Sequence, residues 1–541
     1  MIDLIIKNGL IVDGTGNPPF TGDVVVSRDY IIDVLRSGVP QSDIMQSKCP
    51  GEFRDIPAAH IIDASGMVVA PGFIDIHSHS DENLLADPRA ESKIRQGITT
   101  EVVGNCGSSL APLAGAVEHE VRRGLEALGI KLTWRGFGEY LEALSRRKTA
   151  VNVAALVGHG TIRSAIMGFE SRTPSPGELK AMKDLIIGAM DEGAWGLSTG
   201  LIYPPSSYAS LDELVELARV VGRRGGIYAS HIRNEDYHVV EATREAISIG
   251  EMAGIPVQIS HHKASSRANW GKVAITLAMM DEAREKGNDV TCDVYPYTAS
   301  STGLSVVLPQ WLFEGGRERL LERLRDRHVL DAIRDEVEKR EGQDFGWENV
   351  VVSTVSLEKN KALEGKSILD IARERGREPF DTVIELLLEE GGEVQTVRFG
   401  MCEEDVTAVL CHPESMIGTD AGARAQDGPL SKGKPHPRSY GAFPRVLARY
   451  VREMGALTLE EAVRKMTFAP ARKIGLKRRG VLAKGMFADI TIFDPARVAD
   501  CATYSEPHQY AAGVEYVIVN GVIVVEKGRS SGRFPGRSLA M

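Results

Sequence analysis

The sequence predicts an α/β fold: a (β/α)8 TIM-like barrel with a small β-sandwich domain built from both termini. Between about residues 62 and 470, short apolar strands alternate with helical stretches, and eight such units are what the barrel requires. The two ends instead contain short strands and hairpins, broken at Asn8-Gly9 and at Asn520-Gly521. A chain of 541 residues is also long for one domain.

The candidate barrel strands are short apolar runs. They lie at residues 67–75, 99–104, 151–157, 193–198, 226–230, 255–260, 289–295 and 415–419. Residues 300–400, between the seventh and eighth strands, form a stretch too long for a simple crossover. The segment from Glu314 to Glu341 is charged and helical in pattern. We therefore expect an inserted, mostly helical subdomain between strands 7 and 8.

These elements predict three structural units. Residues 1–61 and 475–541 are expected to form the composite β-sandwich domain, and residues 62–474 the barrel. Residues 300–400 are expected to form the inserted subdomain within the barrel.

Composition and charge narrow the class of protein. The formal net charge of −10 argues against nucleic acid and anionic membranes as partners. The six cysteines, Cys49 among them, show no paired spacing, which suits reduced thiols. Asp3 stands where a signal peptide would need a basic residue, and no run approaches the ~20 apolar residues of a membrane span. We expect a cytoplasmic protein. The sequence is compatible with either a monomer or a homo-oligomer.

A His-X-His pair closes an apolar run at residues 67–79. Side chains two apart on a strand point the same way, so His77 and His79 project together, as two imidazoles that share a metal must. The acid-rich segment Ser80-Asp81-Glu82-Asn83 follows directly. The pair predicts a metal site, and two solvated histidines at a loop entry are the alternative.

Polar side chains also end most of the other predicted strands, where chemistry collects in barrels of this type. At least six of the 13 histidines fall at these ends. This clustering favours a metal centre over isolated core histidines. The set at the later strand ends comprises Cys106, His159, His231, His261, His262, Lys263, Asp293, Tyr295 and Asp420.

Imidazoles, a carboxylate and a thiolate together suit zinc. Cys106 precedes a glycine in a tight turn, and its thiolate could bridge two metals; the alternative is a buried apolar cysteine. His261 and His262 point to opposite faces if the strand continues, so we expect one ligand and favour His261. Asp420, beside a metal-bound water, could take its proton and deliver it to a leaving amine. The alternative for Asp420 is a turn or N-cap aspartate.

At these residues the chain resembles the D-aminoacylases (N-acyl-D-amino-acid deacylases) of the amidohydrolase superfamily, over nearly its whole length. The His-X-His stretch marks only the superfamily, whereas three further motifs together are typical of the deacylase branch. Those motifs are Asn105-Cys106-Gly107, Ser198-Thr199-Gly200-Leu201-Ile202-Tyr203 and Ser260-His261-His262-Lys263. Hydantoinases and dihydroorotases usually bridge two metals with a carboxylated lysine after strand four. Strand four has no lysine here, and the resemblance implies that Cys106 supplies the bridging anion.

The resemblance implies zinc-dependent hydrolysis of N-acyl-D-amino acids to a carboxylate and a free D-amino acid. The alternatives are an amidohydrolase acting on a cyclic amide, as hydantoinases do, and a non-catalytic binding protein on the same barrel. By resemblance, Cys106, His231 and His261 would hold one tight Zn²⁺. His77, His79 and Asp420 would frame a second, weaker site, with Asp420 as the acid/base.

The resemblance also implies the substrate contacts. Tyr203 would help polarise the scissile carbonyl. Lys263, Tyr295 and Arg438, with Ser300 or Ser301, would clamp the α-carboxylate of an N-acyl amino acid, since a planar guanidinium matches a carboxylate.

One departure from the family concerns the loop Ala421–Pro435, which is longer here than in the family. It leaves Arg424 as an alternative anchor to Arg438. His159 and Arg163 are expected either to border the site or to support it.

Overall fold

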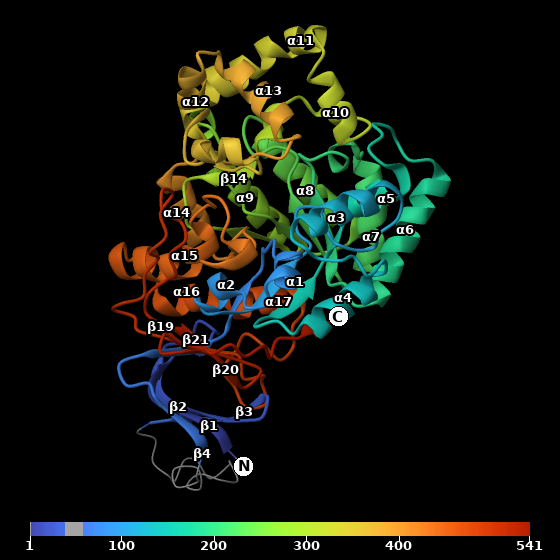
Figure 1. Cartoon of the computed structure of the whole chain (residues 1–541). Helices are drawn as coiled ribbons and strands as arrows, with labels where there is room; N and C mark the ends of the chain where they lie inside the picture. Colours follow the sequence, from blue (N-terminus) through green and yellow to red (C-terminus); the bar gives the residue numbers. More distant parts are fainter. Residues whose placement is uncertain (1, 38–57) are drawn as a thin grey trace.

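The computed structural model describes residues 2–37 and 58–541, and its centre is a parallel barrel (Figure 1). Within the described residues, eight strands pair in parallel around it, and the bridge between Ser78 and Ala421 joins the first to the last. The fold is therefore the predicted α/β TIM barrel. The strands are β6 (Phe73–Asp75), β7 (Ile98–Val103), β8 (Asn152–Ala155) continued by β9 (Val157–Gly158), β10 (Gly196–Gly200), β11 (Ile227–His231), β12 (Val257–Ile259), β13 (Val290–Val294) and β17 (Ser415–Ile417).

Helices surround the barrel because its strands are buried on both faces and need a second apolar layer. Helix α6, for example, begins with a capping box in which Ser175 accepts from the Glu178 amide. The helices outside the inserted segment are α1 (Asn83–Ala86), α2 (Glu91–Ile94), α3 (Gly115–Ala127), α4 (Phe137–Arg147), α5 (His159–Met167), α6 (Pro176–Asp191), α7 (Leu211–Gly222), α8 (Val239–Ala253), α9 (Lys272–Glu285), α14 (Glu403–Cys411), α15 (Arg438–Arg445), α16 (Leu459–Met466) and α17 (Phe468–Ile474).

The two ends of the chain share one sheet, which lies at the bottom of Figure 1. Hydrogen bonds join its strands into one continuous nine-stranded sheet, and residues from both termini form its apolar core. The reason is that β5 pairs with β1 on one side and β18 on the other, which joins the two termini edge to edge. The strands are β1 (Ile2–Ile11), β2 (Phe20–Ser27), β3 (Tyr30–Arg36), β4 (Ala58–Asp63), β5 (Val68–Pro71), β18 (Ile490–Phe493), β19 (Val514–Val519), β20 (Val522–Glu526) and β21 (Arg529–Ser530).

The predicted first barrel strand, 67–75, is in fact two strands, so that prediction was wrong in extent. Its first half, β5, belongs to the terminal sheet, and only β6 belongs to the barrel. The chain changes sheets at Gly72, where a Cβ atom would lie 2.2 Å from the Thr99 hydroxyl. At the other end, β22 (Ser538–Leu539) pairs in parallel with β8, so the last residues return to the barrel.

The inserted segment, between β13 and α14, covers one end of the barrel and lies at the top of Figure 1. It has its own apolar core, which includes Leu304, Ile333 and Phe380. Its three-stranded sheet was not predicted. The segment contains β14 (Ser300–Gly303), α10 (Arg317–Arg323), α11 (Arg327–Val337), β15 (Val350–Thr354), α12 (Ile368–Arg375), α13 (Pro379–Glu389) and β16 (Gln395–Arg398).

Two observations bear on the composition arguments. Cys49 lies outside the described residues, and the other five cysteines are free thiols. In the part of the chain that the structure describes, every helix is too short or too polar to cross a bilayer.

Candidate metal centre and active site

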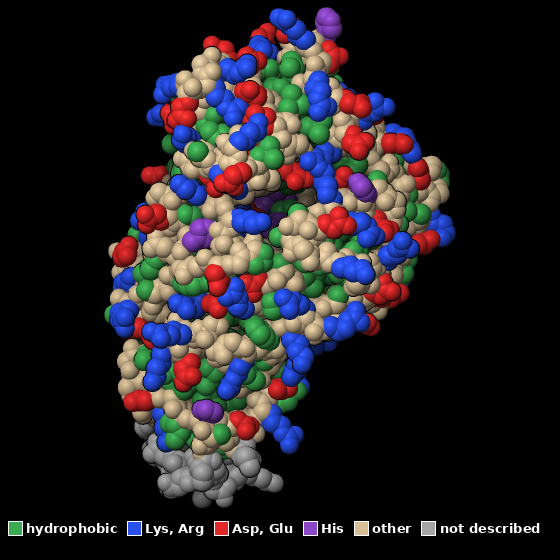
Figure 2. Space-filling model, viewed as in Figure 1, with side chains coloured by type: hydrophobic (Ala, Val, Ile, Leu, Met, Phe, Trp, Pro, Cys, Tyr) green, Lys and Arg blue, Asp and Glu red, His purple; other side chains and the backbone are tan. Residues whose placement is uncertain are grey.

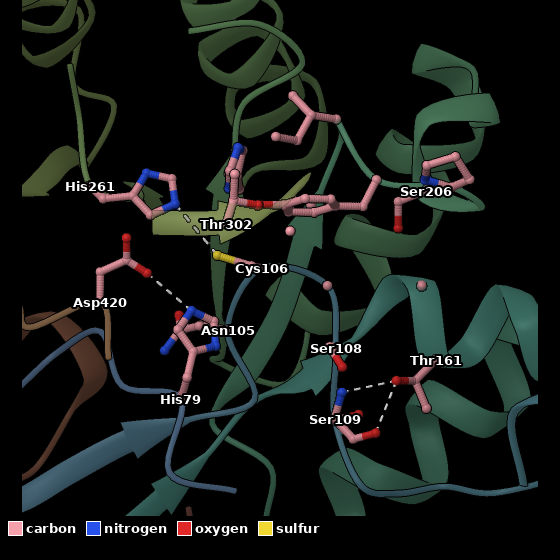
Figure 3. Close-up of a pocket in the computed structure, with 18 of the residues that line it drawn as sticks. His79, Asn105, Cys106, Ser108, Ser109, Thr161, Ser206, His261, Thr302 and Asp420 are labelled. Atoms are coloured by element: carbon pink, nitrogen blue, oxygen red, sulfur yellow. Dashed lines mark hydrogen bonds and ion pairs between the residues drawn. The ribbon is translucent and has the colours of Figure 1, made fainter. Parts of the chain in front are cut away.

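The polar strand ends meet at one point of the barrel mouth (Figure 3). Ligand atoms of His77, His79, Cys106 and Asp420 all lie within 4.8 Å of one another, and so do those of Cys106, His231 and His261. Cys106 belongs to both groups. The structure thus brings together all six side chains that were expected to bind metal, in two adjacent clusters that share one sulfur atom.

A tight turn at the end of β7 presents the Cys106 sulfur. Cys106 has a φ of 52°, and it is flanked by Gly104 and Gly107, whose φ angles are 75° and 76°. The glycines are needed there, since a Cβ atom on Gly104 would lie 2.1 Å from the Leu156 carbonyl oxygen. Ser198 of β10 fixes the turn, because its hydroxyl donates to the Gly104 carbonyl and accepts from the Gly107 amide.

The backbone is strained at three of the six clustered side chains. Besides Cys106, His261 has a φ of 37° and Asp420 a φ of 48°. Left-handed backbone is costly for residues other than glycine, and it is found where a site holds side chains in a set geometry.

The cluster is electrostatically suited to a cation. The Cys106 sulfur lies 3.3 Å from His77 Nε2 and 3.5 Å from His261 Nε2. Burial opposes ionisation of the thiol, but the charges of His77 and His261 hold the pKa of Cys106 well below its usual value. Neither ring nitrogen of the buried His231 makes a hydrogen bond with a described residue. Its Nε2 lies 3.7 Å from Glu235 Oε2. A thiolate and a buried imidazole without a hydrogen bond fit a metal ion better than a purely structural polar network.

Two carboxylates orient the imidazoles from behind. Asp293 accepts from His77 Nδ1 at 3.0 Å and from the His261 amide at 2.8 Å. Glu235 lies 2.9 Å from His261 Nδ1 through its Oε1. Carboxylates of this kind fix the ring orientation and leave the other nitrogen free for a metal. Glu235 has no place in the sequence prediction, although it follows the strand-end His231 by four residues.

Asp420 lies between the imidazoles and a guanidinium. Its Oδ1 is 3.1 Å from His79 Nε2, and its Oδ2 is 2.7 Å from Arg438 Nη1. Burial alone would raise its pKa, but the charges of Arg438 and His261 hold the pKa of Asp420 well below its usual range. The carboxylate is therefore ionised at neutral pH and able to accept a proton.

Arg438, rather than Arg424, stands in the wall of the cavity next to these groups. Its guanidinium carbon lies 4.5 Å from the centre of the Tyr295 ring, and its Nε makes no hydrogen bond with a described residue. The Tyr295 hydroxyl is likewise unpartnered among described residues. Lys263 lies 5.8 Å from the same ring and pairs with Glu235 at 2.5 Å. Arg438 Nε and the Tyr295 hydroxyl therefore remain available to donate to an anion in the cavity.

The cavity has a volume of about 550 Å³. Figure 2 shows it as a hollow between the inserted segment and the barrel, with a histidine side chain inside. Tyr203 and Ser300 line it, and Tyr203 donates to or accepts from Thr302 of β14 at 3.0 Å. The inserted segment therefore contributes directly to the cavity wall.

The other two strand-end histidines, His159 and His262, lie behind the site. His262 turns away from the cavity and lies 2.7 Å from the Thr276 hydroxyl of α9. His159 lies between Ser206 and Glu213, at 2.9 and 3.2 Å, and Arg163 donates to the Pro205 carbonyl. His159 and Arg163 were expected either to border the site or to support it structurally, and these contacts favour the structural role.

Sequence reasoning missed a buried ionic network beneath the cluster. The Lys93 ammonium donates to Asp75 at 2.7 Å, to the Thr419 hydroxyl at 2.8 Å and to the Ala421 carbonyl at 2.8 Å. It also lies 3.2 Å from Glu101. Asp75 in turn accepts from the amides of His77 and Thr419. Lys93 thereby ties the His-X-His turn to the loop that carries Asp420.

Replacing Lys93 with methionine is expected to destabilise the protein by about 3–5 kcal/mol, because it leaves two buried carboxylates without a counter-charge. A fall in the apparent melting temperature would measure this. The control is Lys180→Met, since Lys180 forms only an exposed ion pair with Asp184, worth about 0–1 kcal/mol. Equal melting temperatures for the two variants would contradict the assignment.

Comparison with known proteins identifies the family to which this chain belongs. The amidohydrolase family model matches residues 60–525. The D-aminoacylase of Alcaligenes xylosoxydans xylosoxydans is 38% identical over 538 residues, which is 99% of this chain and 97% of that protein.

Two kinds of solved structure are similar over the whole length. An N-acyl-D-glutamate deacylase from Bordetella bronchiseptica, complexed with zinc and a phosphonate inhibitor that mimics the reaction's tetrahedral intermediate, is 36% identical with a TM-score of 0.82; the comparison covers 100% of both chains. A D-aminoacylase structure, described for its binuclear metal centre with one-metal activation and second-metal attenuation, is 37% identical with a TM-score of 0.80 and the same coverage. By contrast, the L-hydantoinase of Arthrobacter aurescens is 18% identical with a TM-score of 0.53 and shares the fold alone.

The barrel, the clustered strand ends and these full-length similarities lead to one conclusion: the chain belongs to the amidohydrolase family.

Proposed function

We propose that the protein hydrolyses N-acyl-D-amino acids to a carboxylate and a free D-amino acid, with zinc as the metal. The observation that carries the proposal is the meeting of two ligand groups at Cys106, beside an ionised Asp420 and the anion-binding wall around Arg438. Sulfur, imidazole and carboxylate donors suit zinc. The relatives named for D-aminoacylase and deacylase activity support the substrate class and the handedness.

Cys106, His231 and His261 would hold the tightly bound zinc, and His77, His79 and Asp420, with the shared Cys106, would frame the weaker position. When bound, zinc supplies Lewis acidity that polarises the amide carbonyl and makes water a better nucleophile at neutral pH. Asp293 and Glu235 keep the imidazoles of His77 and His261 aimed at the cluster.

Asp420 is the proposed acid/base. Its ionised carboxylate accepts a proton from the attacking water as the carbon–oxygen bond forms. It returns that proton to the nitrogen as the carbon–nitrogen bond breaks, so that the amine leaves in neutral form. Burial raises the pKa of Tyr203, so its hydroxyl keeps its proton and can donate to the carbonyl oxygen.

Lys263, Tyr295 and Arg438 are the proposed clamp for the α-carboxylate, with Ser300 in the same wall. The Tyr295 hydroxyl and Arg438 Nε support this role, because they have no hydrogen-bond partner among the described residues and buried donors are nearly always hydrogen-bonded.

Thr302 is expected to position the Tyr203 hydroxyl. The variant Thr302→Val keeps the shape but removes the hydrogen bond, which is worth about 0.5–1.5 kcal/mol. We expect kcat to fall several-fold with little change in KM, and Thr302→Ser to restore it. Steady-state kinetics on an N-acetyl-D-amino acid measures both. An unchanged kcat in Thr302→Val would show that Thr302 does not position the Tyr203 hydroxyl for catalysis.

A panel of N-acetyl amino acids of both hands, with hydantoins alongside, tests the function. We expect turnover of D substrates, loss of turnover after chelation and recovery with zinc. Turnover of hydantoins but not of linear amides would instead favour the cyclic-amide alternative, although strand β10 offers no lysine to bridge two metals. Turnover of neither would refute the proposal.

We also propose that the chain folds as three units, predicted at residues 1–61 with 475–541, 62–474 and 300–400. The pairing of the strands moves two of these bounds, because β5 (Val68–Pro71) belongs to the terminal sheet and β22 (Ser538–Leu539) to the barrel. The separate apolar cores of the terminal sheet and the inserted segment support this division.

A further inference from the structure

The cavity continues well beyond the groups assigned above. It is also lined by Val117 and Val121 of α3, Ser164 of α5, and Phe169 and Ile202. We call these five side chains the α3–α5 lobe. Figure 3 shows His261 and Asp420 on one side of Cys106, and Ser108, Ser109 and Thr161, which border this lobe, on the other.

The carboxylate clamp lies on the opposite side from the lobe. Arg438 contacts Asp420 at 2.7 Å, and Lys263 lies 2.8 Å from His261 Nδ1, so both cations stand at the His261 and Asp420 side of the cluster. A substrate with its α-carboxylate in the clamp and its amide at the cluster must point its acyl chain away from the clamp. Such a chain would have the α3–α5 lobe in front of it.

Several polar side chains that border the lobe are already paired within the protein. The Ser109 hydroxyl donates to the Ala111 carbonyl, and the Thr161 hydroxyl donates to the Ser109 carbonyl and accepts from the Ser109 amide. The Ser206 hydroxyl is paired with His159. Glu120 of α3, which also lines the cavity, accepts from Arg123 at 2.7 Å. Because other protein groups already pair with these polar side chains, they offer little to a polar acyl group.

We infer that the α3–α5 lobe is an acyl-binding subsite for alkyl or aryl-alkyl acyl groups longer than acetyl. The inference rests on the proposed function and extends it to the acyl half of the substrate. An acetyl group ends at its methyl carbon and leaves the lobe to water, whereas a hexanoyl or phenylacetyl chain buries apolar surface against Val117, Val121 and Phe169.

The test compares kcat/KM for N-acetyl-, N-butanoyl-, N-hexanoyl- and N-phenylacetyl-D-leucine on the zinc-loaded enzyme. Each buried methylene is worth about 0.8 kcal/mol, or roughly fourfold, so burial of only two of the four additional methylenes of hexanoyl should raise kcat/KM by about tenfold or more over acetyl. The variant Val121→Trp, which fills the lobe, should remove this dependence on chain length. The control is Glu126→Trp on an exposed position of α3, which should keep it.

A flat or falling series in the wild type would overturn the inference while the proposed function stands. Loss of dependence on the amino acid's own side chain in Val121→Trp, shown with N-acetyl-D-alanine and N-acetyl-D-phenylalanine, would also overturn it, because it would assign the lobe to that side chain. If Val121→Trp does not fold, Val117→Phe provides the same test. No turnover of any member would refute the function and the inference together.

Discussion

The variant Asp420→Asn is expected to keep its zinc but to lose turnover, with kcat lower by about 10²–10⁴. The amide has nearly the shape of the carboxylate, but it can neither accept a proton from water nor return one to the leaving nitrogen. The other ligand group, which consists of Cys106, His231 and His261, does not include Asp420 and remains intact. Steady-state kinetics and metal analysis of the same preparation measure both quantities.

The matched control is Asp427→Asn. Asp427 lies on the same loop, but its carboxylate is 73% exposed and pairs with Arg89 rather than with the cluster. This variant should behave as the wild type. Near-normal turnover in Asp420→Asn, or parallel losses in both variants, would show that Asp420 is not the acid/base.

The variant Cys106→Ser is expected to lose the tightly bound zinc and, with it, almost all activity. Cys106 is the only sulfur in the two clusters and belongs to both, so its loss weakens both positions. Even residues that only support a ligand are worth about 10–100-fold in metal affinity, so the loss of this ligand should exceed 100-fold. Zinc content after dialysis against a chelator measures the change.

Cys402→Ser is the control, because Cys402 is a free, partly exposed thiol outside both clusters. It should retain zinc and activity. If Cys106→Ser also retained its zinc under the same dialysis, the shared thiolate would have no role in holding the metal.

Local patterns in the sequence predicted the barrel and the polar side chains at its strand ends, and the resemblance to the D-aminoacylases then indicated which of these side chains bind metal. Strand ends with a histidine, cysteine or aspartate can be found from the alternation of apolar runs and polar residues. In a closed parallel barrel those ends must meet at one mouth. The structure places Cys106 beside His261, as the resemblance implied.

The groups that hold this cluster in place could not be predicted in the same way. Glu235 lies in a loop and Lys93 in a short helix, and each acts on residues far away in the sequence. Thr302 comes from the inserted segment, whose docking over the mouth no local pattern specifies. Asp293 did stand at a predicted strand end, but its contact with His77 depends on the fold.

The extent of the first strand shows the same limit. Residues 67–75 form one apolar run, and no periodicity marks a change of sheet at Gly72. The change becomes visible only when β5 is seen to pair with β1 and β18 from the two ends of the chain.

X-ray absorption at the zinc edge of the purified protein tests the central claim most directly, namely that Cys106, His231 and His261 bind one ion. The account predicts a sulfur scatterer at about 2.3 Å together with imidazole nitrogens at about 2.0–2.1 Å. A zinc environment made only of nitrogen and oxygen atoms would contradict it.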